Sequence, residues 1–231
     1  MEDTRLIGID LSMASPIVIE VLIEDAADSQ VLREILLSNI QRPEIIRLLY
    51  ESPNLPQEIQ EDVRKVLNLP AKMGGAPLEL IKVTTEKTEQ EEIRKQNILK
   101  KIQIMTVGEK IHLAIFGGRD VRTILSRDSN KEVVLSVLKN PKLTENEVEM
   151  MARSRNVPED VLRAISKNKE WMKNYAILQA LVNNPKTPPG ISSPMMTSLR
   201  TRDLVSLETN KNVPDSVRSS AKKMLEMRKK R

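Results

Sequence analysis

The chain has 231 residues, with 37 Lys and Arg against 32 Asp and Glu, and a formal net charge of +5. It contains no cysteine, which excludes a disulfide framework, a thiolate metal site and a cysteine nucleophile. With only 1 Trp, 2 Tyr and 1 Phe, its core must consist mainly of Leu, Ile, Val, Ala and Met.

No secretory signal is expected, because Met1-Glu2-Asp3 is acidic and no long apolar run follows it. No stretch approaches the length of a membrane span. We therefore expect a cytoplasmic protein without a membrane partner.

Charge divides the chain unevenly. Residues 1–70 hold 6 Lys/Arg and 13 Asp/Glu, a net charge of −7, whereas the remainder carries a net charge of +12. This division predicts two functional halves.

The acidic half has helical spacing of its apolar residues. Helices are predicted from Pro16 onwards, at 31–37, at 43–50 and through 59–67. The run Ile17–Ile23 is rich in β-branched residues and is also compatible with a strand, although no other run has the spacing of a partner strand.

Residues 68–85 interrupt this pattern with Gly and Pro. They predict an acidic helical segment at 1–68, a linker or long loop at 69–86 and a basic repeat domain at 87–231. The alternative is that 69–86 is a loop inside one continuous array.

Four Ser/Thr-x-x-Glu sequences precede apolar-periodic runs and fit the capping box, in which hydroxyl and carboxylate satisfy free backbone N–H groups at a helix start. They are Thr88/Glu91, Thr106/Glu109, Ser129/Glu132 and Thr144/Glu147. A charged helix is predicted from Glu89 to Met105. Gly117-Gly118 is expected to end the next one, as an ordinary helix–helix turn rather than a phosphate-binding turn.

A recurring Asn signal organises the second half. Asn156, Asn184 and Asn212 stand 28 residues apart, and Asp128 lies 28 before Asn156. Asn tolerates the left-handed conformation that closes a helix, and Pro starts a new helix well. The interval predicts a repeated unit of two short helices that stack on their neighbours. The alternative is an irregular helical bundle in which the interval is a coincidence.

Two segments complete the predicted array. Trp171–Val182 is apolar nearly all round, so we expect one helix buried on several sides at the centre of the C-terminal half. The Pro-rich residues 185–195 are expected to distort the repeat, and the last helix is expected from Pro214.

The sequences Asn140-Pro-Lys-Leu-Thr, Asn156-Val-Pro-Glu-Asp-Val-Leu and Asn183-Asn-Pro-Lys-Thr-Pro, together with Lys169-Glu-Trp, carry a resemblance. Residues 105–225 resemble bacterial short-helical-repeat proteins of the HEAT-like and leucine-rich-repeat-variant style. The resemblance implies an all-α solenoid of short antiparallel helix pairs, and usually a protein-binding scaffold. The iron–sulfur cluster that leucine-rich-repeat variants can carry needs cysteines, so it is not expected here.

No catalytic constellation is visible in the sequence. His112 is the only histidine and has no obvious partner, so a partly buried structural role near Phe116 is expected. There is no Rossmann or P-loop glycine motif. We therefore expect a protein that is not an enzyme and that has no cofactor and no metal site.

Basic residues of the repeats are the candidate partner-binding groups, because on one face they would form a positive stripe. The alternative is an ordinary solvated surface. Trp171 is a candidate anchor, although it and Tyr175 are expected more strongly as core residues. The candidates are Arg119, Arg122, Arg127, Arg153, Arg155, Arg163, Lys167, Trp171 and Lys173.

These features leave three functions open. The first is a non-enzymatic scaffold that binds another protein. The second is a duplex nucleic-acid binder or a HEAT-like DNA-repair glycosylase, which the net charge of +12 after residue 70 suggests. The scarcity of aromatic residues disfavours single-strand or base-specific RNA binding and offers little material for a glycosylase pocket. In the third, the acidic half folds onto the basic half, within one chain or between two.

Overall fold

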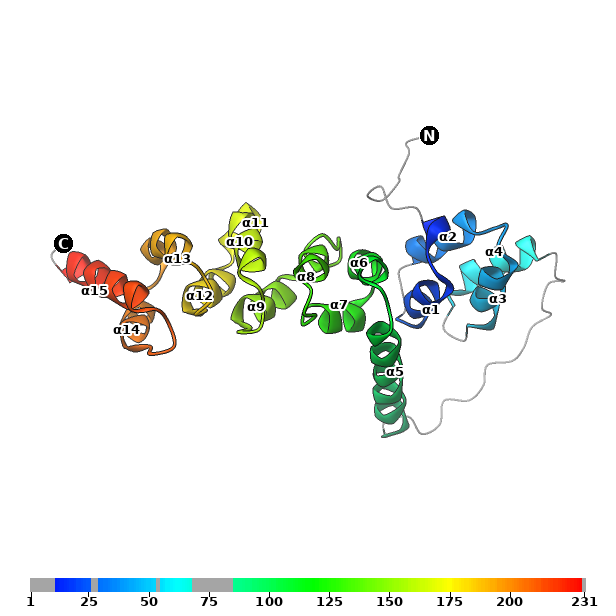
Figure 1. Ribbon diagram of the computed structural model, residues 1–231, viewed down its shortest axis with the longest axis horizontal. Helices are drawn as coiled ribbons and strands as arrows, with labels where there is room; N and C mark the ends of the chain where they lie inside the picture. Colours follow the sequence, from blue (N-terminus) through cyan, green and yellow to red (C-terminus); the bar gives the residue numbers. More distant parts are fainter. Residues whose placement is uncertain (1–10, 26–28, 53–54, 68–84, 230–231) are drawn as a thin grey trace. The chain divides into compact units, whose positions relative to one another are not determined.

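The computed structural model describes residues 11–25, 29–52, 55–67 and 85–229 (Figure 1). Within these ranges the regular elements are α-helices and short 3-10 helices, with no strand. The predicted all-α class is therefore confirmed. The alternative of a strand at residues 17–23 is wrong, because this run lies inside helix α1 (Pro16–Glu24).

The chain divides into two compact units, residues 1–125 and 126–231, which we call unit 1 and unit 2. Unit 1 contains η2 (Leu11–Met13), α1, α2 (Ser29–Ser38), α3 (Pro43–Glu51), α4 (Gln57–Val66), α5 (Thr85–Gln103), α6 (Val107–Phe116) and α7 (Arg119–Leu125). Unit 2 contains α8 (Lys131–Val137), α9 (Glu145–Arg153), α10 (Glu159–Lys167), α11 (Lys169–Lys173), α12 (Tyr175–Asn183), α13 (Pro189–Met195), η3 (Met196–Ser198), α14 (Thr201–Thr209) and α15 (Asp215–Lys229). Most of the predicted linker at 69–86 lies outside the described residues, so its role as a domain boundary stays a prediction.

Helix α1 is the centre of unit 1. Pro16 occupies its first turn and the Ser15 side chain accepts a hydrogen bond from the Val18 N–H, so its sequence starts a helix despite the β-branched residues. Its buried face packs against α3, α5 and α6. Ser15 also donates to the Glu109 carboxylate at 2.5 Å, which joins the starts of α1 and α6.

The capping boxes are confirmed at two of the four predicted positions. Thr106 with Glu109, and Thr144 with Glu147, make both reciprocal hydrogen bonds at the starts of α6 and α9. At α8 the cap is Asn130, whose side chain accepts from the Glu132 N–H, so the prediction for Ser129 is wrong by one residue. The prediction for Thr88 is also wrong, because α5 already begins at Thr85.

The Asn residues close helices by a different route from the predicted left-handed conformation. Asn168, Asn184 and Asn210 have φ values of −80°, −80° and −74°, and all three are extended. The side-chain oxygens of Asn184 and Asn210 accept from the backbone N–H two residues on. A left-handed backbone is therefore not needed to close the helix, because the Asn side-chain oxygen accepts directly from a backbone N–H of the turn.

The turns that follow α8, α9, α12 and α14 share one hydrogen-bond pattern, and its starting residue differs from the predicted one. Its first residue is Asn140, Ser154, Asn184 or Asn210, and in each case the side-chain oxygen accepts from the N–H two residues on. Asn184 thus opens its turn, whereas Asn156 and Asn212 hold the third position. The predicted interval of 28 residues combined two different positions of one turn. For the same reason Pro185 lies inside a turn and does not start α13.

The apolar segment from Trp171 to Val182 forms two helices and not the predicted single one. Asn174 separates α11 from α12, and its side chain accepts from the Ala176 N–H and donates to Glu145 at 2.6 Å. The amide therefore ends one helix, starts the next and contacts α9. Helix α12 itself is buried, as predicted, through Ile177, Leu178, Ala180, Leu181 and Val182.

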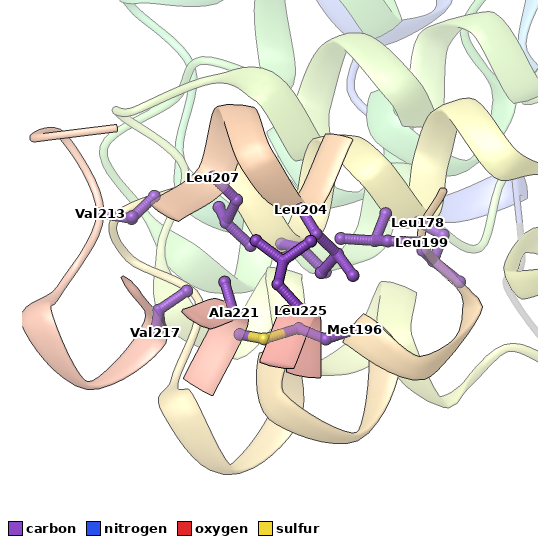
Figure 2. Close-up of a cluster of buried hydrophobic side chains, with 10 residues drawn as sticks. Leu178, Met196, Leu199, Leu204, Leu207, Val213, Val217, Ala221 and Leu225 are labelled. Atoms are coloured by element: carbon purple, nitrogen blue, oxygen red, sulfur yellow. The ribbon is translucent and has the colours of Figure 1, made fainter. Parts of the chain in front are cut away.

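Helices of unit 2 pack on helices further along the chain as well as on their neighbours. α8 packs on α10, α9 on α12, and α13 on α15 (Figure 1). At the C-terminal end of unit 2, α14 packs along α15. Leu204 and Leu207 of α14 meet Ala221 and Leu225 of α15 in a buried apolar cluster (Figure 2). The predicted distortion at 185–195 corresponds to α13, a short helix with Pro194 inside it, followed by η3.

Hydrogen bonds in unit 2 recur between residues about 28 positions apart. Asn174 bonds Glu145 across 29 positions, and Tyr175 bonds Asp203 across 28. Asn184 donates to the carbonyls of Ala152 and Ser154, 32 and 30 positions earlier. These side chains therefore bond helices of unit 2 that do not follow one another directly in the chain.

Replacing Asn184 with alanine is expected to lower the free energy of unfolding of unit 2 by about 2 kcal/mol. Asn184 is only 3% exposed, and its removal leaves the carbonyls of Ala152 and Ser154 without their amide donor. Urea unfolding followed by the fluorescence of the single tryptophan, Trp171, measures the change. Asn156→Ala is the control, because Asn156 is exposed; equal losses in the two variants would contradict the assigned role.

Candidate functional site

A polar pocket of about 330 Å³ lies in unit 2 where the ends of α9 and α12 meet. Most of its side chains are cationic or carry amide groups, in contrast to the apolar interior of the unit. Its lining consists of Arg153, Arg155, Gln179, Ala180, Asn183, Asn184 and Pro185.

The pocket is built by the turns that follow the two helices. Ser154 ends α9, and its hydroxyl accepts from the Asn156 N–H at 3.3 Å, which places Arg155 in the turn. Asn184 ends α12 and donates to the carbonyls of Ala152 at 2.6 Å and Ser154 at 3.0 Å. This amide therefore holds the two ends together.

The charges of the two arginines are compensated unequally. Arg153 pairs with Glu149 at 2.6 Å, one helical turn earlier. Arg155 is exposed and pairs with no carboxylate in the part of the chain that the structure describes. The pocket thus presents one uncompensated guanidinium.

The amide side chains of the pocket are also unequal. Asn183 donates to the Gln179 carbonyl at 2.8 Å and accepts from Asn210 at 3.4 Å, so both ends of its amide are used. The half-buried Gln179 side chain has no such bond to another described residue. Arg155 and Gln179 are therefore the pocket groups available to a ligand.

The structure brings together two of the predicted partner-binding residues, Arg153 and Arg155. Arg122 does not belong to an accessible surface, because it is 5% exposed and donates to the Gly117 carbonyl at 3.2 Å. This candidate is therefore corrected to a structural residue of the turn between α6 and α7. Arg119, Arg127 and Lys167 are exposed but do not line the pocket.

Several of the remaining predicted cations are neutralised by nearby carboxylates. Arg163 pairs with Glu159 at 2.5 Å and Lys173 with Glu170 at 2.7 Å, each within its own helix. Such pairs reduce the charge available to a polyanion. The predicted positive stripe is thus interrupted by acidic partners.

The two aromatic residues of unit 2, Trp171 and Tyr175, lie outside the pocket lining. Trp171 is half-buried. Tyr175 packs against the buried cluster at the C-terminal end of unit 2, bonds Asp203 and lies 4.7 Å from the Arg200 guanidinium. Tyr175 is therefore partly buried at the edge of the core, which agrees only in part with the predicted core role. The suggestion of Trp171 as an anchor stays a prediction.

Gln179, Asn183 and Asn184 are not among the partner-binding residues predicted from the sequence. Gln179 and Asn183 are four positions apart on an otherwise apolar helix, which places both amides on one helix face. The spacing of these two residues could therefore have indicated a polar patch on α12. The approach of that helix face to Arg155 could not be predicted, because it depends on the packing of α12 against α9.

The backbone N–H groups at the turn Gly117-Gly118 are hydrogen-bonded to a carboxylate of the same unit. Asp25 at the end of α1 accepts hydrogen bonds from the backbone N–H groups of Gly118 and of Val121, the latter at 3.4 Å. Arg94 lies 3.8 Å from the same carboxylate. The turn is therefore a helix–helix connection, as predicted, and its backbone N–H groups donate to Asp25.

The pKa of Asp25 is raised from 3.8 to about 6, chiefly by burial and also by the nearby Asp120, against the lowering effect of the backbone hydrogen bonds and Arg94. Between these two values the folded state binds more protons than the unfolded state. Ionisation of Asp25 therefore costs stability as the pH rises.

As the pH rises from about 4 to about 7, we expect the wild-type protein to lose up to about 3 kcal/mol relative to Asp25→Asn. The difference between pKa values of 3.8 and about 6 sets this limit. Urea unfolding at a series of pH values, followed by circular dichroism, measures the difference. A constant offset between the two proteins over this range would show that the Asp25 carboxyl is not perturbed.

Other features of the described residues give no second site. His112 is half-buried, as predicted, and its Nδ1 has no hydrogen-bond partner there. No group of three or more His, Asp or Glu in the described part of the chain is arranged to hold a metal ion. None of the described helices has the length and apolar character needed to cross a membrane.

Comparison with protein families, with curated proteins and with solved structures finds no match to this chain. The pocket must therefore be interpreted from its own chemistry.

Proposed function

We propose that this chain is a non-enzymatic α-helical scaffold of the HEAT-like solenoid type, and that it binds another protein through the pocket in unit 2. The solenoid part of the proposal is supported by the bonds between residues about 28 positions apart. It is also supported by the packing of α8 on α10 and of α9 on α12. Short helices of this size need neighbours, because they are marginal in isolation.

The observation that carries the binding proposal is the convergence of Arg155 and Gln179 on a pocket with a fixed wall. Arginine is enriched at protein interfaces, where its planar fork recognises carboxylates and carbonyls. Asn183 and Asn184 are already bonded within unit 2, so the wall loses little freedom when a partner binds.

Duplex nucleic acid is the less favoured ligand. Phosphate recognition along a duplex needs several unpaired cations in series. In unit 2, Lys131, Arg153, Arg163 and Lys173 instead pair with Asp160, Glu149, Glu159 and Glu170. These pairs support a protein partner with a localised contact.

Affinity capture with mass spectrometry tests the proposal, using the full chain as bait with and without nuclease. We expect at least one stoichiometric protein that survives nuclease and is lost with an Arg155→Glu bait. Arg127→Glu is the matched control, because Arg127 is exposed and does not line the pocket. Loss of all captured proteins after nuclease would instead favour the nucleic-acid function.

A further inference from the structure

We propose that the pocket binds one carboxylate of an acidic segment in the partner protein, with Arg155 as the pairing cation. This inference rests on the proposed function and names the chemistry of the partner. The Arg155 guanidinium pairs with the carboxylate, and the Gln179 amide bonds a peptide group beside it. Both side chains line the same pocket.

The charges in the pocket favour a single negative group. Glu149 compensates Arg153 at 2.6 Å, so Arg155 alone supplies an unbalanced positive charge. The end of a helix normally repels an anion, because its free carbonyls carry partial negative charge. At α9 this repulsion is reduced, since the Asn184 amide donates to the carbonyls of Ala152 and Ser154.

The hydrogen-bonding groups favour a carboxylate over a phosphate. A carboxylate matches the two parallel N–H donors of one guanidinium. A phosphate dianion carries more charge and more acceptor oxygens than one unpaired arginine can satisfy. The second available group, Gln179, is neutral and both donates and accepts, which suits the peptide group next to an acidic side chain.

Binding of short capped peptides to the full chain, measured by fluorescence anisotropy, tests this inference. The probes are a peptide with a single central Glu, the same peptide with Gln, and the same peptide with phosphoserine. We expect the Glu peptide to bind about tenfold more tightly than the Gln peptide, because only the former makes charge-assisted hydrogen bonds to Arg155. The preference should weaken when salt is raised.

Arg155→Gln should abolish the preference for Glu, and Arg155→Lys should keep part of it, because lysine retains the charge but not the fork. Arg127→Gln should leave it unchanged. Circular dichroism melting checks that each variant is folded. A preference that survives in Arg155→Gln, equal binding of the Glu and Gln peptides, or tightest binding of the phosphoserine peptide would each overturn the inference.

The two proposals fail in different ways. If the Arg155→Glu bait loses a protein partner but the Glu peptide shows no preference, the scaffold function stands and the acidic ligand is wrong. If the peptide preference depends on Arg155 but no protein is captured, the pocket chemistry stands and the scaffold function is wrong.

Discussion

Replacing Leu207 with alanine should lower the free energy of unfolding of unit 2 by about 3–4 kcal/mol. Leu207 is fully buried in the cluster between α14 and α15, and its truncation removes apolar contacts and leaves a cavity (Figure 2). Urea unfolding followed by Trp171 fluorescence measures the loss, since the chain has no other tryptophan.

The control for this substitution lies on the same helix. Val205 is 50% exposed, so Val205→Ala should change the free energy of unfolding by less than about 0.5 kcal/mol. If the two variants lost similar stability, the assignment of the buried face of α14 would be incorrect.

Gly118→Ala should destabilise unit 1 by about 3 kcal/mol. A Cβ atom at this position would lie 2.7 Å from both the backbone oxygen and the Oδ2 atom of Asp25. The backbone oxygen belongs to the end of α1, so the clash is not relieved by rotation of a flexible side chain. Displacing the turn would also weaken the hydrogen bonds to the buried Asp25 carboxylate. Chemical unfolding monitored by circular dichroism measures the effect.

Gly108→Ala provides the matched comparison. A Cβ at Gly108 meets nothing within 4 Å, and this residue lies in the first turn of α6. Alanine there should be neutral or stabilising by up to about 1 kcal/mol, because it restricts the unfolded chain and favours helix. A Gly118→Ala protein as stable as Gly108→Ala would rule out the close approach to Asp25.

Much of the local structure could be predicted from the sequence, because helix starts depend on neighbouring residues. Pro16, the Thr106/Glu109 box and the Thr144/Glu147 box each determine a nearby helix start. Hydrogen bonds also join residues of unit 2 that lie 28 to 32 positions apart, close to the predicted interval. The register was wrong by two residues, since Asn156 and Asn184 look equivalent in sequence but occupy different positions of the turn.

The site was less predictable, because it depends on contacts between distant residues. Arg153 and Arg155 were recognisable as cations, but their difference comes from Glu149, which compensates only one of them. Arg122 looks like the other cations in the sequence, but it is buried and donates to the Gly117 carbonyl in the turn before α7. The role of Asn184 depends on two carbonyls about thirty positions earlier. Spacing alone does not identify such partners.

Native-state hydrogen exchange of Asn184→Ala tests most directly the proposal that the helices of unit 2 hold one another in place as a stacked array. The substitution lies after α12, whereas its lost acceptors are the carbonyls of Ala152 and Ser154 at the end of α9. We expect faster exchange in the last turn of α9 as well as in α12, and wild-type rates there in Asn156→Ala. Faster exchange confined to α12 and α13 would contradict the account.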